Sequence, residues 1–233
     1  ANKSNAEAQH LLGEIYERGR GVPRNREVAM QWYLQAAEQG NVKALFDIGS
    51  MYCYGSGVPT DYTKAIEWYM EAAKQGDINA QYRVGEMFSE GLGILQDKEK
   101  ALKWYMSAGE QGHVIAQLNV AIIYINGDGV HKDTVEAMKW FLKAAEQGEP
   151  NAQYLLGDLY SKGRDIPTNY PLAYMWLSLA GGINGKSKEI KSLEKKMTPA
   201  QIKQAKLLIS EYLMNHQEES GYSVQSRSCS RKN

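Results

Sequence analysis

The chain has 233 residues, of which 43% are hydrophobic, and its 27 basic residues equal its 27 acidic ones, so the formal net charge is zero. A chain of this size and composition can bury a hydrophobic core, which excludes a disordered or fibrous protein. The balanced charge argues against general binding to nucleic acids or anionic membranes, and the longest apolar run, Val120 to Ile125, is too short to span a bilayer.

A repeat of 36 residues organises most of the sequence. All five tryptophans fall on this period, at Trp32, Trp68, Trp104, Trp140 and Trp176. Columns of alanine and glycine recur at the same spacing without an insertion. We number the columns by the first repeat, so that residues 10, 46, 82, 118 and 154 share column 10. The pattern predicts five repeats (5–40, 41–76, 77–112, 113–148 and 149–184), then a capping region (185–215) and a disordered tail (216–233).

Each repeat is predicted to form two helices. In the first repeat, Ala8, Leu12 and Ile15 recur at the spacing of one helical face, and Gly19 with Gly21 then interrupts the helix. The second helix begins after a short polar residue that can cap free backbone N–H groups. That column contains Asn25, Asp61, Asp97, Asp133 and Asn169. One helix pair cannot bury both of its faces, so five pairs are expected to stack into an all-α solenoid with a concave surface.

Small residues occupy column 13, where we expect them to let neighbouring helices approach closely while tyrosine and tryptophan fill the space between helix pairs. These residues are Gly13, Gly49, Gly85, Ala121 and Gly157. This column therefore predicts packing and not chemistry.

Repeat two carries a nearly whole motif in which small and aromatic residues predominate. Its members are Ala44, Ile48, Gly49, Tyr52, Gly55, Gly57, Val58, Lys64, Ala65, Trp68, Tyr69, Ala72, Ala73 and Gly76. With this motif the chain resembles the Sel1-like repeat family over about residues 5–184. Asp165 departs from the pattern, because it replaces the second loop glycine of repeat five. The resemblance implies a tetratricopeptide-like, right-handed α-solenoid that acts as a non-enzymatic scaffold or adaptor for a protein or peptide.

The resemblance also bears on location. Bacterial members of the family are often exported, and some contribute to virulence or host interaction, so it favours a periplasmic or secreted protein over a cytoplasmic one. A cysteine-rich subgroup binds β-lactams and carries one disulfide per repeat. The chain has only Cys53 and Cys229, without that pairing pattern. An envelope-associated protein that binds or hydrolyses β-lactams or peptidoglycan is therefore an alternative and not the main expectation.

The capping region is predicted to contain two helices. The segment 186–197 has a helical pattern, and Thr198-Pro199-Ala200-Gln201 is typical of a helix start, with threonine as the cap and glutamine three residues later. An apolar face follows in the next helix and is expected to cover the open end of the solenoid. From His216 onward the chain is polar and rich in serine, which predicts disorder.

No residue pattern predicts catalysis, a metal site or a cofactor. The histidines are scattered, at His10, His113, His131 and His216, without the H-E-x-x-H spacing of a zinc site. Ser192 and Lys195 match S-x-x-K, but the accompanying S-D-N and K-T-G motifs do not occur. Cys53 directly follows a core position and has no repeated histidine beside it, so a thiol nucleophile is not expected.

The predicted partner-binding surface lies on columns 7, 10, 14 and 17 of the first helices and next to them, by analogy with tetratricopeptide repeats. It comprises Phe46, Tyr54, Tyr82, Glu86, Ile115, Leu118, Ile122, Ile125, Tyr154 and Asp158. Repeat four has an aliphatic residue at all four columns, where repeat one has Glu7, His10, Glu14 and Glu17. For column 10, packing between adjacent first helices is an equal alternative.

The occupant expected for this surface is an amphipathic helix or an extended peptide across repeats two to four. Two alternatives remain, since the aliphatic patch could be covered by the protein's own tail or by a second copy in a self-assembling structure. We expect a monomer, with a homodimer as the alternative, and neither nucleic-acid binding nor membrane insertion.

Overall fold

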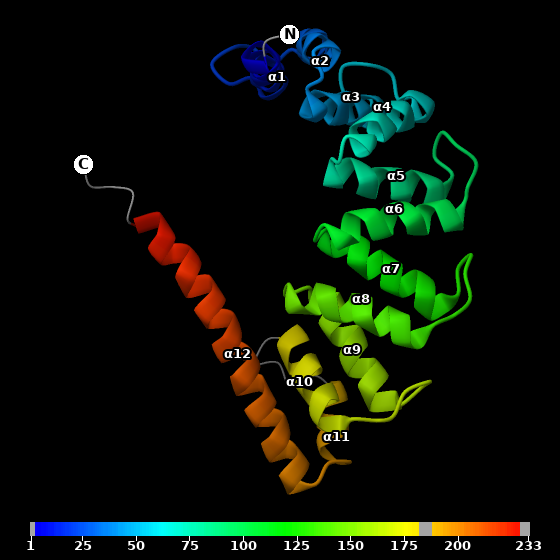
Figure 1. The fold of residues 1–233 in the computed structure, drawn as a ribbon, viewed down its shortest axis with the longest axis vertical. Coiled ribbons are helices and arrows are strands. Elements are labelled where there is room, and N and C mark those ends of the chain that lie inside the picture. The colour runs from blue at the N-terminus through cyan, green and yellow to red at the C-terminus, as the bar shows by residue number, and fades with distance from the viewer. Residues whose placement is uncertain (1–2, 182–187, 229–233) are drawn as a thin grey trace. The chain divides into compact units, whose positions relative to one another are not determined.

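The computed structural model describes residues 3–181 and 188–228, with side chains for 5–181 and 188–216. These residues form helices and connecting turns, with no strand among them. The chain divides into two compact units, Ala1–Asp133 and Thr134–Asn233. The all-α solenoid predicted from the repeat is therefore confirmed (Figure 1).

The first unit contains seven helices in the described residues. They are α1 (Lys3–Arg18), α2 (Arg26–Glu38), α3 (Val42–Tyr54), α4 (Tyr62–Lys74), α5 (Ile78–Glu90), α6 (Lys98–Glu110) and α7 (Val114–Asn126). The odd-numbered helices are the first helices of their repeats and the even-numbered ones are the second helices. Each helix packs on the next one along the chain.

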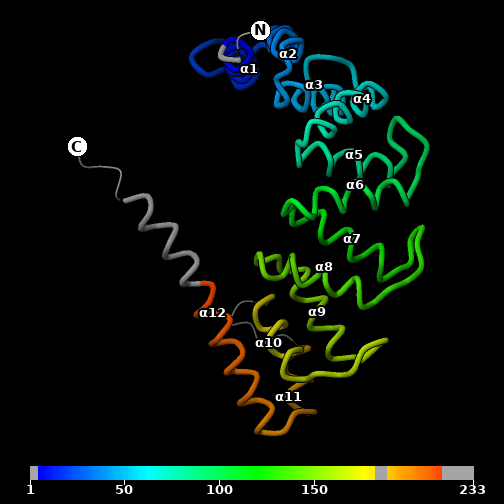
Figure 2. Tube along the Cα trace, viewed as in Figure 1, coloured from blue at the N-terminus to red at the C-terminus, as the bar shows by residue number. Residues whose placement is uncertain are grey.

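The second unit contains α8 (Thr134–Glu146), α9 (Pro150–Lys162), α10 (Tyr170–Ala180), α11 (Lys188–Glu194) and α12 (Pro199–Ser228). The tube in Figure 2 follows these helices in chain order. None of the helices in the described ranges is both long and apolar enough to cross a membrane.

Side-chain caps fix where the helices begin. Four of the predicted caps are present, because the oxygens of Asn25, Asp61, Asp97 and Asn169 each accept a bond from the backbone N–H three residues later. First helices have caps of their own that the sequence analysis did not identify. Asn41 and Asp77 accept from the backbone N–H groups of Ala44 and Ala80. A polar residue before each helix thus satisfies an otherwise unpaired donor.

Column 13 is the point of closest approach between the two helices of a repeat. A Cβ atom at Gly49 or at Gly85 would lie 2.7 Å from the ring of Tyr69 or Tyr105 on the second helix of the same repeat. Since real Cβ contacts are not this short, glycine at these two positions lets the tyrosine ring come close to the first helix. This confirms the expectation that small residues at this column permit close packing.

Buried glutamines connect successive repeats. Gln81 and Gln117 each donate through Nε2 to a backbone carbonyl eight residues earlier, at the end of the preceding second helix, over 3.3 and 2.8 Å. Gln153 makes the same contact to Ala145 in the second unit, over 3.1 Å. Each of these carbonyl oxygens also accepts from the backbone N–H three residues later, so the glutamine adds a second hydrogen bond at the helix end.

The first helix is less buried than its equivalents. Ala8 is exposed and Leu12 and Ile15 are half-buried, whereas Ala44 and Ala80 in the same column as Ala8 are fully buried. In later repeats the preceding second helix covers this face, and among the described residues no helix precedes α1.

The loop of repeat five tolerates its missing glycine. Asp165 has a φ of 60°, in the left-handed region where the other repeats place glycine. Aspartate is one of the few other residues that adopt this conformation, and its carboxylate accepts a bond from Thr134 Oγ1 at 3.0 Å. The turn of repeat five therefore has the same left-handed backbone conformation at aspartate as the other repeats have at glycine.

The capping region packs against repeat five as expected. Ala173 and Leu177 of α10 form a core with Ile190 and Leu193 of α11 and with Ala205 of α12. The predicted cap of α12 is reciprocal, since Gln201 N–H donates to Thr198 Oγ1 and Thr198 N–H donates to Gln201 Oε1.

Two boundaries differ from the sequence pattern. Helix α11 ends at Glu194, short of the predicted residue 197, because the chain then turns to enter α12. Helix α12 continues to Ser228, through residues that the polar composition predicted to be disordered; no proline follows Pro199 to stop it. Residues 186–187 and 229–233 lie outside the described residues.

Candidate interaction surface

In repeats one to three, the residue at column 10 packs on the second helix of its own repeat. The ring of Phe46 lies 5.4 Å from that of Tyr69, and the ring of Tyr82 lies 5.8 Å from that of Tyr105. His10 contacts Tyr33 in the same way, with ring centroids 5.4 Å apart. Phe46 and Tyr82 are half-buried, so each side chain keeps part of its surface accessible.

The hydroxyl of the second-helix tyrosine requires a polar partner on the first helix. Tyr33 donates to Glu17 at 2.8 Å, and Tyr69 donates to Ser50 at 3.0 Å. In repeat four the equivalent residue is a phenylalanine, and columns 14 and 17 are Ile122 and Ile125. The sequence of repeat four therefore contains neither the hydroxyl nor its polar partner.

Four side chains form a cluster on α5 and at the start of α7, which we call the Glu86 cluster: Tyr82, Arg83, Glu86 and His113. Glu86 accepts from the Tyr82 hydroxyl at 2.7 Å and from the Arg83 guanidinium at 2.6 Å. The ring of Tyr82 also stacks on the imidazole of His113. Burial, and then the bond to Glu86, raises the pKa of the Tyr82 hydroxyl, so this tyrosine remains a donor.

The isoleucines of α7 give this surface its apolar part. Ile115 is 40% exposed and Ile122 is 36% exposed, two turns further along the same face. Ile125 is half-buried, whereas Leu118 is only 8% exposed. Leu118, which was predicted to belong to the partner-binding surface, is therefore buried and offers a partner little surface.

The last turn of α3 adds an exposed aromatic ring. Tyr54 is 63% exposed, which leaves most of its ring in solvent. The neighbouring Cys53 is half-buried, and burial raises the pKa of its thiol. A raised pKa reduces the thiolate fraction at neutral pH, so the environment of Cys53 disfavours a role as a nucleophile.

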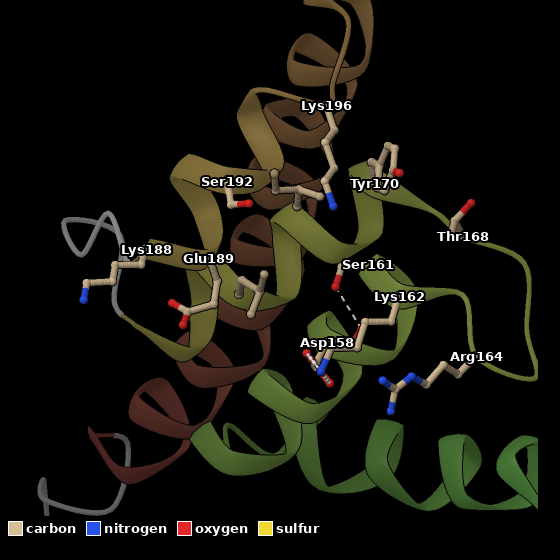
Figure 3. A pocket seen from close by; sticks show the side chains of 12 residues that line it. Asp158, Ser161, Lys162, Arg164, Thr168, Tyr170, Lys188, Glu189, Ser192 and Lys196 are labelled. Carbon is tan, nitrogen blue, oxygen red and sulfur yellow. Dashed lines mark hydrogen bonds and ion pairs between the residues drawn. The ribbon is translucent and has the colours of Figure 1, made fainter.

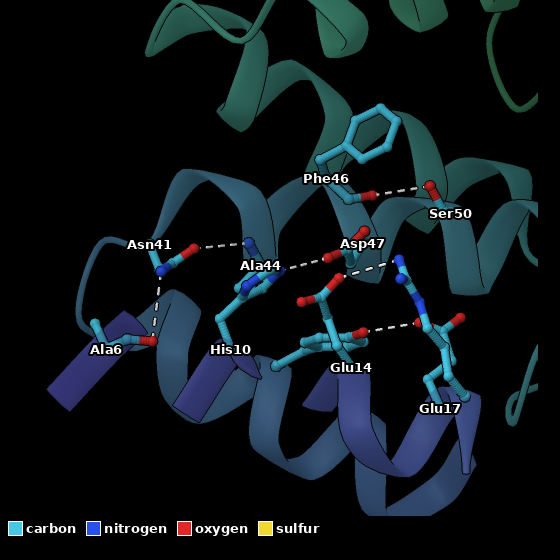
Figure 4. A network of polar contacts seen from close by, with 11 residues as sticks. Ala6, His10, Glu14, Glu17, Asn41, Ala44, Phe46, Asp47 and Ser50 are labelled. Atoms are coloured by element: carbon cyan, nitrogen blue, oxygen red, sulfur yellow. Dashed lines mark hydrogen bonds and ion pairs between the residues drawn. The ribbon is translucent and has the colours of Figure 1, made fainter. Parts of the chain in front are cut away.

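Repeat one contributes a polar end to the first unit (Figure 4). His10 Nε2 lies 2.6 Å from Asp47 Oδ2, and Glu14 pairs with Arg18 at 3.1 Å. A shallow cleft of about 430 Å³ lies here, lined by His10 and Glu14 together with Glu7 and Leu11. In contrast to the exposed isoleucines of α7, this end presents mainly charged groups.

The remaining predicted residues lie on α9 in the second unit. Tyr154 is 43% exposed, in agreement with an accessible position. Asp158 pairs with Lys162 at 2.7 Å and lines a separate cleft next to α11. The predicted surface residues therefore divide into an α3–α5–α7 group and an α9 group, each within its own unit.

The described residues contain no group of three or more His, Cys, Asp or Glu side chains that could hold a metal ion. Ser192 is exposed and lines the cleft of the second unit, whereas Lys195 does not line it. The S-x-x-K pattern therefore does not place the serine and this lysine together in a pocket.

Sequence reasoning missed two members of the Glu86 cluster. Arg83 lies at column 11, which does not belong to the expected groove columns, and His113 was interpreted only as a scattered histidine. A signal for His113 existed, since its column contains the caps Asn41 and Asp77. The His113 ring fills the same role, because its Nδ1 accepts from the Ala116 N–H at 3.1 Å.

Comparison with known proteins gives a consistent family match. The Sel1 repeat matches the sequence five times, over residues 6–41, 42–77, 78–113, 114–149 and 150–181. A Sel1 repeat protein from Oxalobacter formigenes is 33% identical, with a TM-score of 0.75 over 92% of this chain and 88% of that one. A protective antigen of uropathogenic Escherichia coli strains that displays an SLR fold is 29% identical, with a TM-score of 0.74.

The match to the Escherichia coli antigen covers 90% of this chain and 46% of that protein, so the chain spans about half of the antigen's length. No match was found among curated proteins.

Proposed function

The chain belongs to the Sel1 repeat family, whose members generally mediate protein–protein interaction, and we propose that it is a non-enzymatic adaptor that binds a protein or peptide on its first helices. The observation that carries this proposal is the exposure of Ile115 and Ile122 on α7, the helix whose N-cap, His113, belongs to the polar Glu86 cluster. An exposed apolar strip with a polar border is typical of a surface that a partner covers.

The partner that fits is an amphipathic helix or an extended peptide with aliphatic or aromatic anchors. Ile115 and Ile122 are seven residues apart on one helix and offer two adjacent apolar contacts. Tyr54 offers a third, more exposed contact. Apolar side chains spaced along one face of a helix, or on alternate residues of an extended peptide, can make such contacts.

Polar groups around the apolar strip supply direction and specificity. Both oxygens of Glu86 are already used by Tyr82 and Arg83, which holds the cluster rigid before a partner arrives. Preorganised side chains lose little entropy on binding. Half-buried Phe46 and exposed Tyr154 extend the proposed surface within their own units.

We also infer a bacterial, exported protein with a role in host interaction. The support is the similarity to a protective antigen of uropathogenic Escherichia coli. Detection of the protein in the periplasmic or culture fraction of its source cells tests this location, and its recovery in the cytoplasmic fraction alone would contradict it.

The adaptor proposal is tested by affinity capture with three purified proteins: the native chain, the Ile115→Glu, Ile122→Glu variant, and Leu95→Glu as a matched control. Leu95 is 87% exposed, in the loop after α5, so its replacement introduces a charge outside the proposed surface. Circular dichroism establishes that all three are folded. We expect a partner that the native chain and the control retain and the double variant loses.

If the folded double variant retains the same proteins as the native chain, the binding surface is not on α7. Sedimentation of the native chain over a range of concentrations provides the second readout. Self-association that the double variant abolishes would identify a second copy, and not a separate partner, as the occupant of this surface.

A further inference from the structure

A cleft of about 650 Å³ lies in the second unit between the end of α9, the α9–α10 loop, α10 and α11 (Figure 3). It is separate from the isoleucines of α7, which belong to the first unit. Its volume is in the range of small-molecule sites in proteins. Nothing in the adaptor proposal depends on this cleft.

The side chains around the cleft carry an excess of positive charge. Four cationic residues line it, Lys162, Arg164, Lys188 and Lys196, against the two carboxylates of Asp158 and Glu189. Lys162 is neutralised by Asp158, with Nζ and Oδ1 2.7 Å apart. Neither Arg164 nor Lys196 forms an ion pair with another residue that the structure describes.

Lys188 likewise forms no ion pair with another described residue, and these three cations lie at different places around the cleft. Arg164 belongs to the loop after α9, and Lys196 follows the end of α11. Figure 3 shows the Lys196 side chain reaching towards the space beside Tyr170, and Arg164 on the other side of the cleft near Lys162, whereas Lys188 lies at the far edge. Two cations that approach a cleft from opposite sides favour a ligand with more than one negative charge.

Hydroxyl groups and an apolar floor complete the lining. Thr168, Tyr170 and Ser192 present hydroxyls that can donate to anionic oxygens. Leu177 and Leu193 also line the cleft, although only 5% and 4% of their surface is exposed. The cleft therefore offers charge and donors at its rim and a hydrocarbon surface below.

We propose that this cleft binds a small organic phosphate monoester. Arg164 and Lys196 hold the phosphate dianion, which offers three acceptor oxygens to the cations and hydroxyls at the rim. The organic part of the ligand lies on Leu177 and Leu193. A carboxylate carries one charge and two oxygens, and so satisfies this set of donors less completely.

Phenyl phosphate is the probe for the test, with inorganic phosphate and phenol as its separate halves and benzoate as the carboxylate analogue. Binding to the full chain is measured by calorimetry and by amide chemical shifts. We expect phenyl phosphate to bind about tenfold more tightly than any of the other three. The shifts should be centred on residues 161–170 and 188–196.

Three single variants locate the site. Replacing Arg164 or Lys196 by alanine should weaken phenyl phosphate binding about tenfold, as expected for a lost charge-assisted hydrogen bond. Lys195→Ala is the matched control, because Lys195 is an exposed lysine next to Lys196 that does not line the cleft. It should leave the affinity within about twofold, because Lys195 lies outside the cleft and its charge is screened by solvent.

Three results would overturn the proposal. The first is no saturable binding of phenyl phosphate at millimolar concentration. The second is an equal loss of affinity in Lys195→Ala and Lys196→Ala, which would indicate a general attraction to positive charge. The third is that phenol or benzoate binds as tightly as phenyl phosphate. None of these results bears on the adaptor function, because the probes do not contact α7.

Discussion

The ring of Tyr82 stacks on the imidazole of His113, with ring centroids 4.5 Å apart and planes inclined by 15°. The same imidazole caps α7 by accepting a bond from the Ala116 N–H at Nδ1. One histidine thus joins the first helices of repeats three and four, and it can cap α7 only while Nδ1 is unprotonated.

This arrangement predicts that the protein loses stability in mild acid. Burial lowers the pKa of His113 below its ordinary value of 6.5, and the charge of Arg83 acts in the same direction, opposed by Glu86. The imidazole of His113 therefore binds a proton less readily in the folded state than in the unfolded state. His113 therefore makes its full contribution to the stability of the fold above pH 6.5. This contribution declines as the pH falls below 6.5.

The measurement is the melting temperature between pH 5 and 8 for the native chain and His113→Asn, since asparagine caps α3 at the equivalent position and does not titrate. We expect the native chain to lose more stability than the variant between pH 7 and pH 5. Parallel curves for the two proteins would show that His113 is not responsible.

Gly85→Ala should destabilise the protein, although alanine is the better helix former by about 1 kcal/mol. The added methyl group would lie 2.7 Å from Cδ1 of Tyr105, so the ring or the helix must move. Overpacking of this kind costs about 1–3 kcal/mol. Thermal unfolding tests whether the substitution lowers the stability of the protein. A variant more stable than the native chain would mean that the Tyr105 ring moves away from the added methyl group at little cost.

Cys53 should react slowly with thiol reagents in the folded protein. Its half-buried thiol has a raised pKa, with burial as the main cause. In a Cys229→Ser background, the rate of alkylation by iodoacetamide at pH 7.5 should be several-fold lower for the native fold than in urea. A folded protein that reacts faster than the unfolded one would reveal an activated thiol and reopen an enzymatic role.

Thr198→Ala should weaken the attachment of α12. The Thr198 hydroxyl accepts from the Gln201 N–H, and the loss of a capping side chain costs about 1 kcal/mol. Thr63→Ala is a suitable control, because Thr63 is exposed inside α4 and is not a cap. Chemical denaturation of the native chain and the two variants compares their free energies of unfolding. An equal loss in both variants would exclude a capping role for Thr198.

Local pattern determined most of the architecture. The period of 36, the caps such as Asn25 and Asp61, and the glycines of column 13 each predict a feature that the structure contains. These features depend on residues close together in the sequence or on a contact that recurs in repeat after repeat. A helix start, a turn and a close helix crossing are therefore visible without knowledge of the whole fold.

The accessible surface was decided by tertiary structure. Leu118 and Ile122 lie one turn apart on α7 with similar side chains, yet Leu118 is buried and Ile122 is exposed. Helical periodicity shows which residues share a face, but burial depends on which neighbouring helix covers that face. The Glu86 cluster and the cleft beside α11 arise for the same reason, since each joins side chains from elements whose distance in space the sequence does not specify.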